Sequence, residues 1–198
     1  MTAIVVPFRG ADAKRRLAPA QDEARTSLAL AMLADVLAAC GAVGRTLVVT
    51  GDEAARTVAV ELGVAALDDP SGGQGSAVAY ALALVPIAPT LVVNADLPCV
   101  VPDDLRALEA AIPPGGLALA PAADGTTNAL GLSDPRLFRP LYGAGSAERF
   151  RRLGDAATVE VPSLVDDVDT LEDLMRLEGR VGPRTQMAVA MAGLVPAT

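Results

Sequence analysis

Histidine and tryptophan are both absent from this 198-residue sequence. Without histidine the chain cannot form a Ser-His-Asp triad, a Cys-His pair or a histidine metal site, so any catalysis must use carboxylates, cations, hydroxyls, backbone amides or a bound metal ion. Aromatic residues make up only 3% of the sequence, whereas hydrophobic residues make up 52%. The core is therefore expected to be aliphatic, and this composition excludes an intrinsically disordered chain.

Basic residues are scarce as well. The chain has 16 Lys+Arg against 24 Asp+Glu, a formal net charge of -8, and Lys14 is its only lysine. A nucleic-acid-binding protein needs a basic stripe, so this balance argues against nucleic acid as a partner. The two cysteines, Cys40 and Cys99, lie far apart in apolar contexts. They predict neither a disulfide framework nor a zinc site, and they suit a reducing cytoplasm.

The sequence predicts no membrane partner. Its N-terminus has no basic start and no long apolar core, and it is typical of a first strand rather than a signal peptide. The stretch Ser76–Ala95 is nearly all apolar and about as long as a membrane span, but Pro86 and Pro89 interrupt it and Asp96 follows at once. We expect a buried helix, a turn and a buried strand there, in a cytoplasmic protein.

Apolar runs alternate with helical patterns over the first 112 residues. The runs are continuous rather than alternating, which is typical of parallel strands buried on both faces and joined by helical crossovers. They predict an α/β, Rossmann-like three-layer fold, with a mostly parallel sheet and helices on both faces. The expected strands are 2–7, 45–50, 64–67 and 90–93, and the expected helices are 24–40, 52–62, 74–84 and 102–111.

The second half of the chain has a less regular pattern. We expect one domain over residues 1–180, followed by a C-terminal tail, 181–198, that forms a short helix. The apolar character of this tail favours a homodimer. The expected strands of this half are 117–120, 129–132 and 158–161, and the expected helical pieces are 135–141, 146–153 and 170–177.

Three aspartates are candidate metal ligands. Ligands bind at the carboxyl ends of parallel strands, and Asp96 follows a fully apolar strand. Asp167 and Asp169 are two residues apart, so in an extended segment both carboxylates project to the same side and can reach one Mg²⁺. The alternative is that Asp169 and Thr170 merely cap the helix that follows. The presence of Asp96 on the same edge of the sheet favours the metal site.

A glycine-rich loop, Gly72–Ser76, leads into the helix expected after the third strand. Backbone amides at such a position can cradle an anion, and in nucleotidyltransferase-type folds this loop often grips a base or ribose. It matches neither a Walker A loop nor a G-x-G-x-x-G motif, and an ordinary loop before a helix is the alternative.

Cations gather just after the first strand. Arg9, Lys14 and Arg16 follow it, and together they would neutralise a triphosphate or a substrate phosphate. A solvated charged loop is the alternative, but the position after the first strand favours a functional role.

Several short segments form a recognisable series along the chain. They are V-V-P-F-R (5–9), A-K-R-R-L (13–17), N-A-D-L-P (94–98), G-T-T-N-A-L (125–130), Y-G-A-G-S (142–146) and D-V-D-T-L-E-D-L (167–174). Taken in this order, they resemble the motifs of the CofC-type guanylyltransferase family, which joins GMP to 2-phospho-L-lactate or phosphoenolpyruvate in the biosynthesis of coenzyme F-420. The resemblance covers most of residues 3–186, and it is specific through the order and spacing of its motifs rather than through any single one.

The resemblance implies a nucleotidyltransferase fold, GTP as co-substrate, Mg²⁺ as cofactor and pyrophosphate as leaving group. Its implied acceptor is phosphoenolpyruvate or 2-phospho-L-lactate, between which the sequence does not choose. The implied roles are catalysis for Lys14, Arg16 and Asp96, metal binding for Asp96, Asp167 and Asp169, acceptor binding for Thr127, Asn128, Gly143 and Ser146, and nucleotide binding for Pro7, Arg9, Gly73, Gly75 and Ser76.

The chain also departs from the family pattern. Arg9 stands where lysine is usual, Arg15 replaces a small residue, and Gly73–Ala77 replaces a G-L-N-x-A stretch, which leaves the choice of base open. The rival functions are a nucleotidyltransferase for molybdopterin or a sugar phosphate, a nucleotide-sugar glycosyltransferase that uses the D-x-D motif, and a non-catalytic nucleotide-binding relative. The first usually carries a G-G-x-S-x-R-M-G loop after strand one, and this sequence lacks it.

Overall fold

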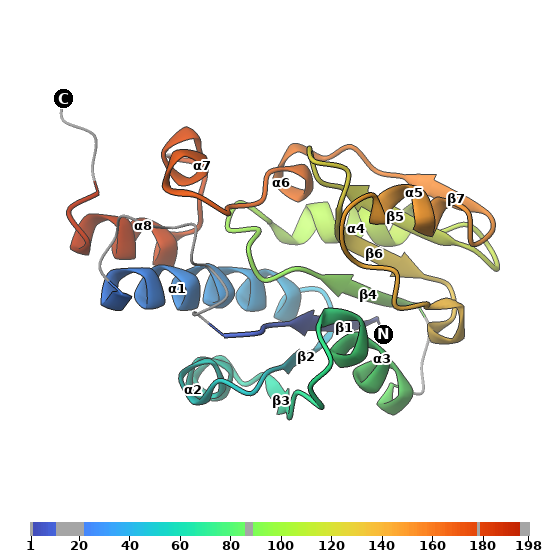
Figure 1. Ribbon diagram of the computed structural model, residues 1–198, viewed down its shortest axis with the longest axis horizontal. Coiled ribbons are helices and arrows are strands. Elements are labelled where there is room, and N and C mark those ends of the chain that lie inside the picture. The colour runs from blue at the N-terminus through green and yellow to red at the C-terminus, as the bar shows by residue number, and fades with distance from the viewer. Residues whose placement is uncertain (1, 11–21, 86–88, 178, 195–198) are drawn as a thin grey trace.

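The computed structural model describes residues 2–10, 22–85, 89–177 and 179–194. A seven-stranded mixed sheet forms its centre, with strand order β3-β2-β1-β4-β6-β5-β7 (Figure 1). Strand β6 is antiparallel to both of its neighbours, and all other pairs are parallel. The strands are β1 (Ala3–Pro7), β2 (Arg45–Val49), β3 (Ala65–Leu67), β4 (Thr90–Val93), β5 (Leu117–Pro121), β6 (Thr127–Leu132) and β7 (Ala156–Thr158).

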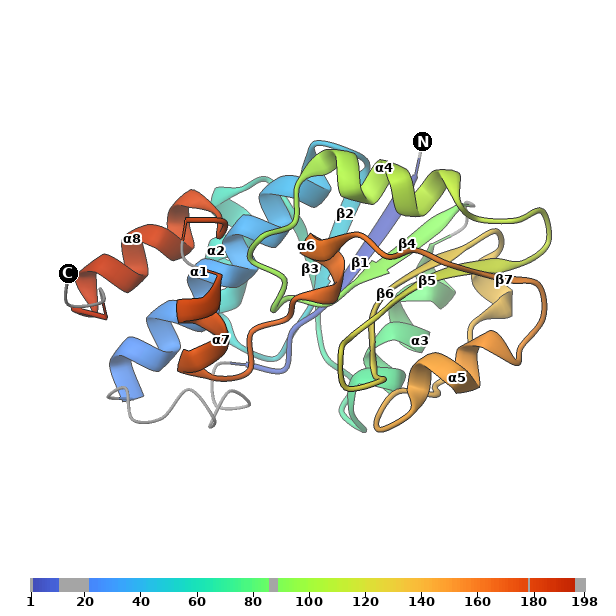
Figure 2. The ribbon, with the colours of Figure 1, turned by 90° about the horizontal axis from the view of Figure 1, so that it is seen from above.

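Helices cover both faces of this sheet, which confirms the predicted fold class (Figure 2). The alternation of side chains along β1 explains the layers: Ile4 and Val6 pack toward one set of helices, and Val5 packs toward the other. The first set is α1 (Asp22–Gly41), α2 (Glu53–Glu61), α4 (Pro102–Ala110) and α6 (Pro162–Val165), and the second is α3 (Gln74–Leu84), the 3-10 helix η2 (Pro135–Leu137) and α5 (Ser146–Arg151).

A tight turn reverses the chain between β5 and β6. Gly125 has a φ of 82°, a backbone conformation that suits glycine, and Asp124 Oδ1 accepts a hydrogen bond from the Thr126 amide at 2.9 Å. Because β6 runs antiparallel to β4, its first residues, Thr127 and Asn128, lie at the edge where β4 ends. This edge, the carboxyl end of β4, carries the site described below.

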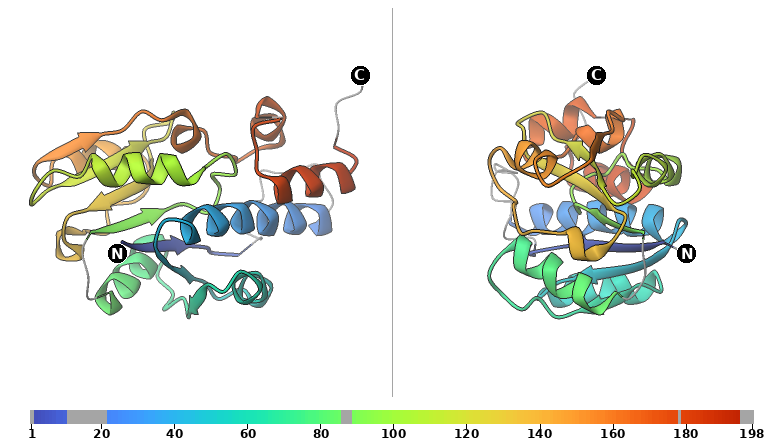
Figure 3. Two further views of the ribbon diagram at one scale, coloured as in Figure 1. Left: turned by 180° about the vertical axis from the view of Figure 1, so that it is seen from behind. Right: turned by 90° about the vertical axis from the view of Figure 1, so that its right-hand side faces the viewer.

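The C-terminal segment packs on the first half of α1 (Figure 3). Helices α7 (Leu171–Arg176) and α8 (Pro183–Met191) bury apolar side chains against Leu28 and Met32. The buried Asp35 of α1 accepts hydrogen bonds from the amide of Thr185 at 2.8 Å and from its hydroxyl at 2.7 Å. Part of the expected tail therefore forms a helix joined to the body, and the domain boundary at residue 180 stays a prediction.

Two apolar stretches bear on membrane association. Helix α3 ends at Leu84 and β4 begins at Thr90, so the apolar run over residues 76–95 divides into a helix and a strand. Within the described residues, the helix Glu23–Gly41 is long and apolar enough to cross a membrane, and 56% of its apolar 18-residue stretch is buried. Its place between the sheet and α8 is that of a core helix.

Candidate active site

Three carboxylates meet at the carboxyl end of β4. Asp96 lies in the loop after this strand, and Asp167 and Asp169 lie between α6 and α7. One oxygen from each of the three is within 4.8 Å of the other two, and all three residues are half-buried. The structure thus brings together the three aspartates that the sequence singled out. We call them the carboxylate cluster.

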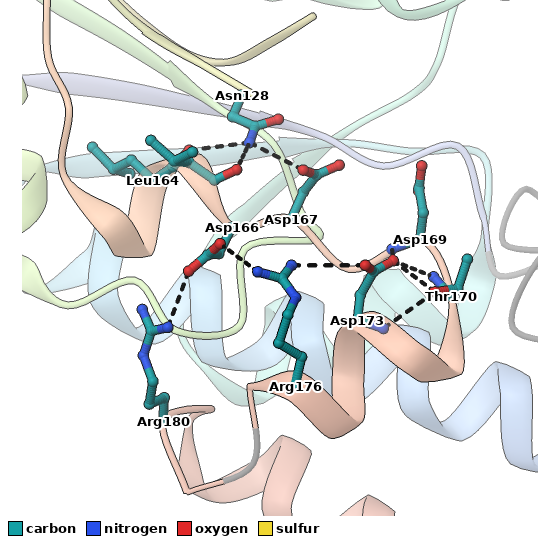
Figure 4. A network of polar contacts seen from close by, with 10 residues as sticks. Asn128, Leu164, Asp166, Asp167, Asp169, Thr170, Asp173, Arg176 and Arg180 are labelled. Atoms are coloured by element: carbon teal, nitrogen blue, oxygen red, sulfur yellow. Dashed lines mark hydrogen bonds and ion pairs between the residues drawn. The ribbon is translucent and has the colours of Figure 1, made fainter. Parts of the chain in front are cut away.

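Local packing sets the direction of two of these side chains. Val168 is fully buried between α1 and α7, so its neighbours Asp167 and Asp169 project away from that core (Figure 4). The Val168 amide donates a hydrogen bond to the carbonyl of Asp96 at 3.0 Å. This backbone bond joins the two loops that carry the cluster.

The residues around the D-x-D motif have other partners. Asp166 forms ion pairs with Arg176 and Arg180, both at 3.0 Å, on the side away from the cluster (Figure 4). Thr170 caps α7, since its hydroxyl accepts from the Asp173 amide at 3.2 Å and the Asp173 carboxylate accepts from the Thr170 amide at 2.9 Å. The helix cap is therefore Thr170, and Asp169 faces the cluster.

Asn128 holds Asp167 in place. Its side-chain amide donates to the carbonyls of Leu164 and Val165 at 3.0 and 3.1 Å, and to Asp167 Oδ1 at 3.4 Å. Burial, and after it the negative charge of Asp96, raise the pKa of Asp167 to about 6, although the hydrogen bond from Asn128 acts in the opposite direction. Carboxylates that repel one another in this way favour the binding of a cation.

A pair of side-chain hydrogen bonds through Asn94 connects the end of β4 to β6 and to α3. Asn94 donates from Nδ2 to the Thr127 carbonyl at 3.2 Å, and its Oδ1 accepts from Gln74 Nε2 at 2.7 Å. Neither Gln74 nor Asn94 was singled out from the sequence. Their signal was position alone, since Gln74 lies inside the glycine-rich loop and Asn94 lies two residues before Asp96.

A cavity of about 200 Å³ opens beside the cluster. Its polar lining consists of Asp96, Asp169, Asn94 and Gln74, together with Arg9 from the segment after β1. The predicted nucleotide-binding residues Pro7 and Arg9 are therefore in one cavity with two of the three aspartates. The full lining is Pro7, Phe8, Arg9, Gly10, Ala29, Met32, Gln74, Asn94, Ala95, Asp96 and Asp169.

Other predicted residues lie outside this lining. Gly73 is the N-cap of α3, a Cβ on Gly75 would lie 2.7 Å from that of Pro140, and the Ser76 hydroxyl donates to the Gly72 carbonyl at 3.3 Å. These contacts shape the loop from which Gln74 projects, and the nucleotide contacts expected of Gly73, Gly75 and Ser76 stay predictions. Lys14 and Arg16 fall outside the described residues.

The predicted acceptor-binding residues form a separate group next to the cluster. Thr127 Oγ1 and Ser146 Oγ are 3.0 Å apart, and both residues are buried, so their hydroxyls link β6 to α5. Gly143 is exposed in the loop before α5. Arg149, which was not singled out from the sequence, contacts the backbone of this loop, and no local motif points to that role.

Comparisons with known proteins identify the relatives of this chain. A family model described as "Guanylyl transferase CofC like" matches residues 2–177. A phosphoenolpyruvate guanylyltransferase from Streptomyces scabiei is 39% identical over 205 residues, covering 94% of this chain and 95% of that protein.

Among solved structures, a nucleotide-diphospho-sugar transferase from Desulfovibrio desulfuricans aligns with a TM-score of 0.78 at 15% identity, over 98% of this chain and 95% of that one. A 2-C-methyl-D-erythritol 4-phosphate cytidylyltransferase from Thermus thermophilus aligns with a TM-score of 0.59 at 18% identity, over 96% of this chain and 98% of that one. At these identities the structures support the fold alone.

Proposed function

Because the chain belongs to the CofC-like guanylyl transferase family, we propose that it joins GMP from GTP to phosphoenolpyruvate, or to 2-phospho-L-lactate, in coenzyme F-420 biosynthesis. The family confirms the resemblance stated from the sequence, and it makes the protein a nucleotidyltransferase that uses a nucleoside triphosphate. The observation that carries the proposal is the carboxylate cluster beside a cavity that Arg9 also lines.

The donor set of the cluster fits Mg²⁺. This ion prefers oxygen ligands at about 2.1 Å, so two oxygens on opposite sides of one ion are about 4.2 Å apart. The ligand oxygens of Asp96, Asp167 and Asp169 lie within 4.8 Å of one another, close to that span. When bound, Mg²⁺ would neutralise charge on the reacting phosphates and on the departing pyrophosphate.

The reaction needs no histidine. An oxygen of the acceptor's phosphate, already ionised at neutral pH, attacks the α-phosphorus of GTP. The new P–O bond forms as the bond from the α-phosphorus to the α,β-bridging oxygen breaks, and pyrophosphate leaves with that electron pair. Since the nucleophile carries no proton that must be removed, no general base is required, and the chain's task is to position two anions and stabilise their charge.

The residues divide this task between them. The aspartates Asp96, Asp167 and Asp169 would hold the metal, and Asn128 orients Asp167 for that role. The guanidinium of Arg9 would offset phosphate charge in the cavity. Lys14 and Arg16 would act with it, in keeping with their place after β1 in the sequence.

The proposed function also includes a cellular location, a class of partners and an oligomeric state. It places the enzyme in the cytoplasm with small-molecule substrates and no nucleic acid partner, in keeping with the net charge of -8. It includes a homodimer formed through the C-terminal segment, where Met187 and Met191 of α8 are 66% and 83% exposed.

A pyrophosphate-release assay tests the proposed function. The assay combines ATP, GTP, CTP or UTP with phosphoenolpyruvate, 2-phospho-L-lactate, a sugar phosphate or no acceptor, each with and without Mg²⁺. We expect release from GTP only when Mg²⁺ and a three-carbon phosphorylated acid are both present. Release with the sugar phosphate alone, or release that does not depend on an acceptor, would contradict the proposal.

A further inference from the structure

Arg149 of α5 donates hydrogen bonds to the carbonyls of four consecutive residues. Its side chain lies behind the loop that precedes α5, so most of its N–H groups are directed at backbone oxygens of that loop. The bonds run from Nε and Nη2 to Leu141 O at 3.2 and 2.8 Å, from Nη2 to Tyr142 O at 3.2 Å and Gly143 O at 3.3 Å, and from Nη1 to Ala144 O at 2.6 Å.

These bonds determine where the loop's own amides point. In a planar trans peptide unit the C=O and the following N–H point in opposite directions. Because the carbonyls of residues 141–144 face the guanidinium, the N–H groups of residues 142–145 face away from it. Within the described part of the chain, none of these four N–H groups donates a hydrogen bond. We call residues 142–145 the amide loop.

Two glycines allow the loop to adopt this shape. Gly143 and Gly145 have φ values of 104° and 69°, a region in which a side chain is strained. Residues 143–145 are exposed, so a ligand can reach this part of the loop. Backbone N–H groups turned outward in succession form a concave donor surface that suits an anion.

The amide loop is joined to the residues next to the carboxylate cluster. Ser146 directly follows it, and its hydroxyl is 3.0 Å from that of Thr127, the residue before Asn128. Asn128 in turn contacts Asp167. A substrate that binds at the carboxylate cluster could therefore place an anionic group against the N–H groups of the amide loop.

We propose that Arg149 is a positioning residue for the acceptor acid: it holds the amide loop so that its N–H groups receive an anionic group of that acid. This inference rests on the proposed function and adds to it the residue that prepares the acceptor site. Arg149 acts through the loop rather than on the substrate, because its donors are already directed at carbonyls. A guanidinium suits this role because its planar fork reaches several acceptors at once.

The test compares Arg149→Ala with Arg152→Ala. Arg152 lies one residue beyond α5, is 74% exposed and pairs only with Glu148 among the described residues, at 3.1 Å, which makes it a matched control. We expect Arg149→Ala to raise the KM for phosphoenolpyruvate by about 10- to 100-fold, as misplaced positioning groups do, while the KM for GTP changes less than about twofold. Arg152→Ala should leave both values unchanged.

Two further measurements separate positioning from simple loss of structure. Guanidinium ion added at millimolar concentration should restore part of the acceptor affinity of Arg149→Ala and should have no effect on Arg152→Ala. Arg149→Lys keeps the charge but not the planar fork, so it should recover only a small part of that affinity. Equal increases in both KM values without rescue by guanidinium would overturn the inference and mark Arg149 as merely structural.

Binding of phosphoenolpyruvate alone keeps this inference distinct from the proposed function. The readout is the increase in melting temperature that saturating phosphoenolpyruvate and Mg²⁺ cause in the absence of GTP. An increase in the wild type and in Arg152→Ala, but not in Arg149→Ala, supports the inference even if no pyrophosphate is ever released. Turnover by the wild type with an unchanged acceptor KM in Arg149→Ala would overturn the inference and leave the proposed function standing.

Discussion

The carboxylate cluster and the amide loop lie close together at one edge of the sheet, yet they have opposite polarity. The cluster gathers Asp96, Asp167 and Asp169 from distant parts of the chain, and their mutual repulsion favours a cation from outside. The amide loop already contacts a cation of the chain, because the Arg149 guanidinium donates hydrogen bonds to its carbonyls. The N–H groups of the loop therefore face away from Arg149. With this difference in polarity, a chain with one lysine and no histidine would have separate places for a metal ion and for an anionic group.

The largest effect is expected when a negative charge is removed from the carboxylate cluster and the adjacent aspartate is left intact. Asp167→Asn should lower the Mg²⁺-dependent rate by roughly a thousandfold, because a metal ion contributes several kcal/mol of charge stabilisation in the transition state. Asp166→Asn is the matched control, since Asp166 pairs with Arg176 and Arg180 outside the cluster. Steady-state pyrophosphate release measures both variants, and equal losses would contradict the assignment.

Substitution of Asn128 should have a smaller effect on the carboxylate cluster. Asn128→Ala removes the donor that orients Asp167, so Mg²⁺ affinity should fall by about 10- to 100-fold, as it does when partners of metal ligands are lost. The acceptor KM should change less than the Mg²⁺ affinity, because the amide loop is held by Arg149. Calorimetric titration with Mg²⁺ measures the affinity, and an unchanged value would show that Asn128 has no part in the metal site.

The raised pKa of Asp167 predicts a pH dependence. Its carboxyl has a pKa of about 6 in the folded protein, above the ordinary value of about 3.9, so a proton competes with the metal below pH 6. The affinity for Mg²⁺ should therefore fall by up to about tenfold per pH unit between pH 6 and pH 4 and be level above that range. A Mg²⁺ affinity that does not change between pH 4 and pH 6 would show that Asp167 is not a ligand of the metal.

The raised pKa of Asp167 also predicts how the stability of the metal-free protein depends on pH. Whereas Mg²⁺ affinity should increase with pH, stability should decrease. Between about pH 4 and pH 6 the folded state holds a proton that the unfolded state has lost, so the free energy of unfolding should decrease as pH rises through this window. Asp167→Asn should remove this contribution, and urea denaturation at several pH values measures it.

The smallest expected effect on activity comes from Asp35. Its carboxylate accepts hydrogen bonds from the first turn of α8. The Gly182 amide, just before α8, donates to the carbonyl of Pro98 at 2.7 Å, in the loop that also carries Asp96. Asp35→Ala should lower the free energy of unfolding by about 1–3 kcal/mol, the cost of leaving buried donors unpaired, with a change in rate of only a few-fold. Asp103→Ala removes an exposed carboxylate and should have little effect, and urea denaturation compares the two.

Much of the carboxylate cluster could be predicted from the sequence. The apolar run before Asp96 placed it at the carboxyl end of a buried strand, and the spacing of Asp167 and Asp169 put both on one side of an extended segment. The alternative, that Asp169 and Thr170 cap the following helix, is correct for Thr170, because this residue exchanges the capping hydrogen bonds with Asp173. The sequence does not distinguish the two residues, since both aspartate and threonine are good helix caps.

The amide loop is the part that sequence reasoning could not reach. Arg149 acts on backbone carbonyls, which every residue possesses, so no side-chain motif records its role. The antiparallel direction of β6 was also missed, because a strand buried on both faces has the same apolar pattern in either direction. That reversal is what places Thr127 and Asn128 at the site.

The proposed function depends above all on the binding of one divalent cation by three aspartates from two loops. Crystals grown with Mn²⁺ and GTP test it directly, since the anomalous signal of manganese locates the ion. We expect a peak within about 2.0–2.3 Å of oxygens from Asp96, Asp167 and Asp169. A well-ordered cluster without a peak, or a manganese ion that contacts only one of the three, would contradict it.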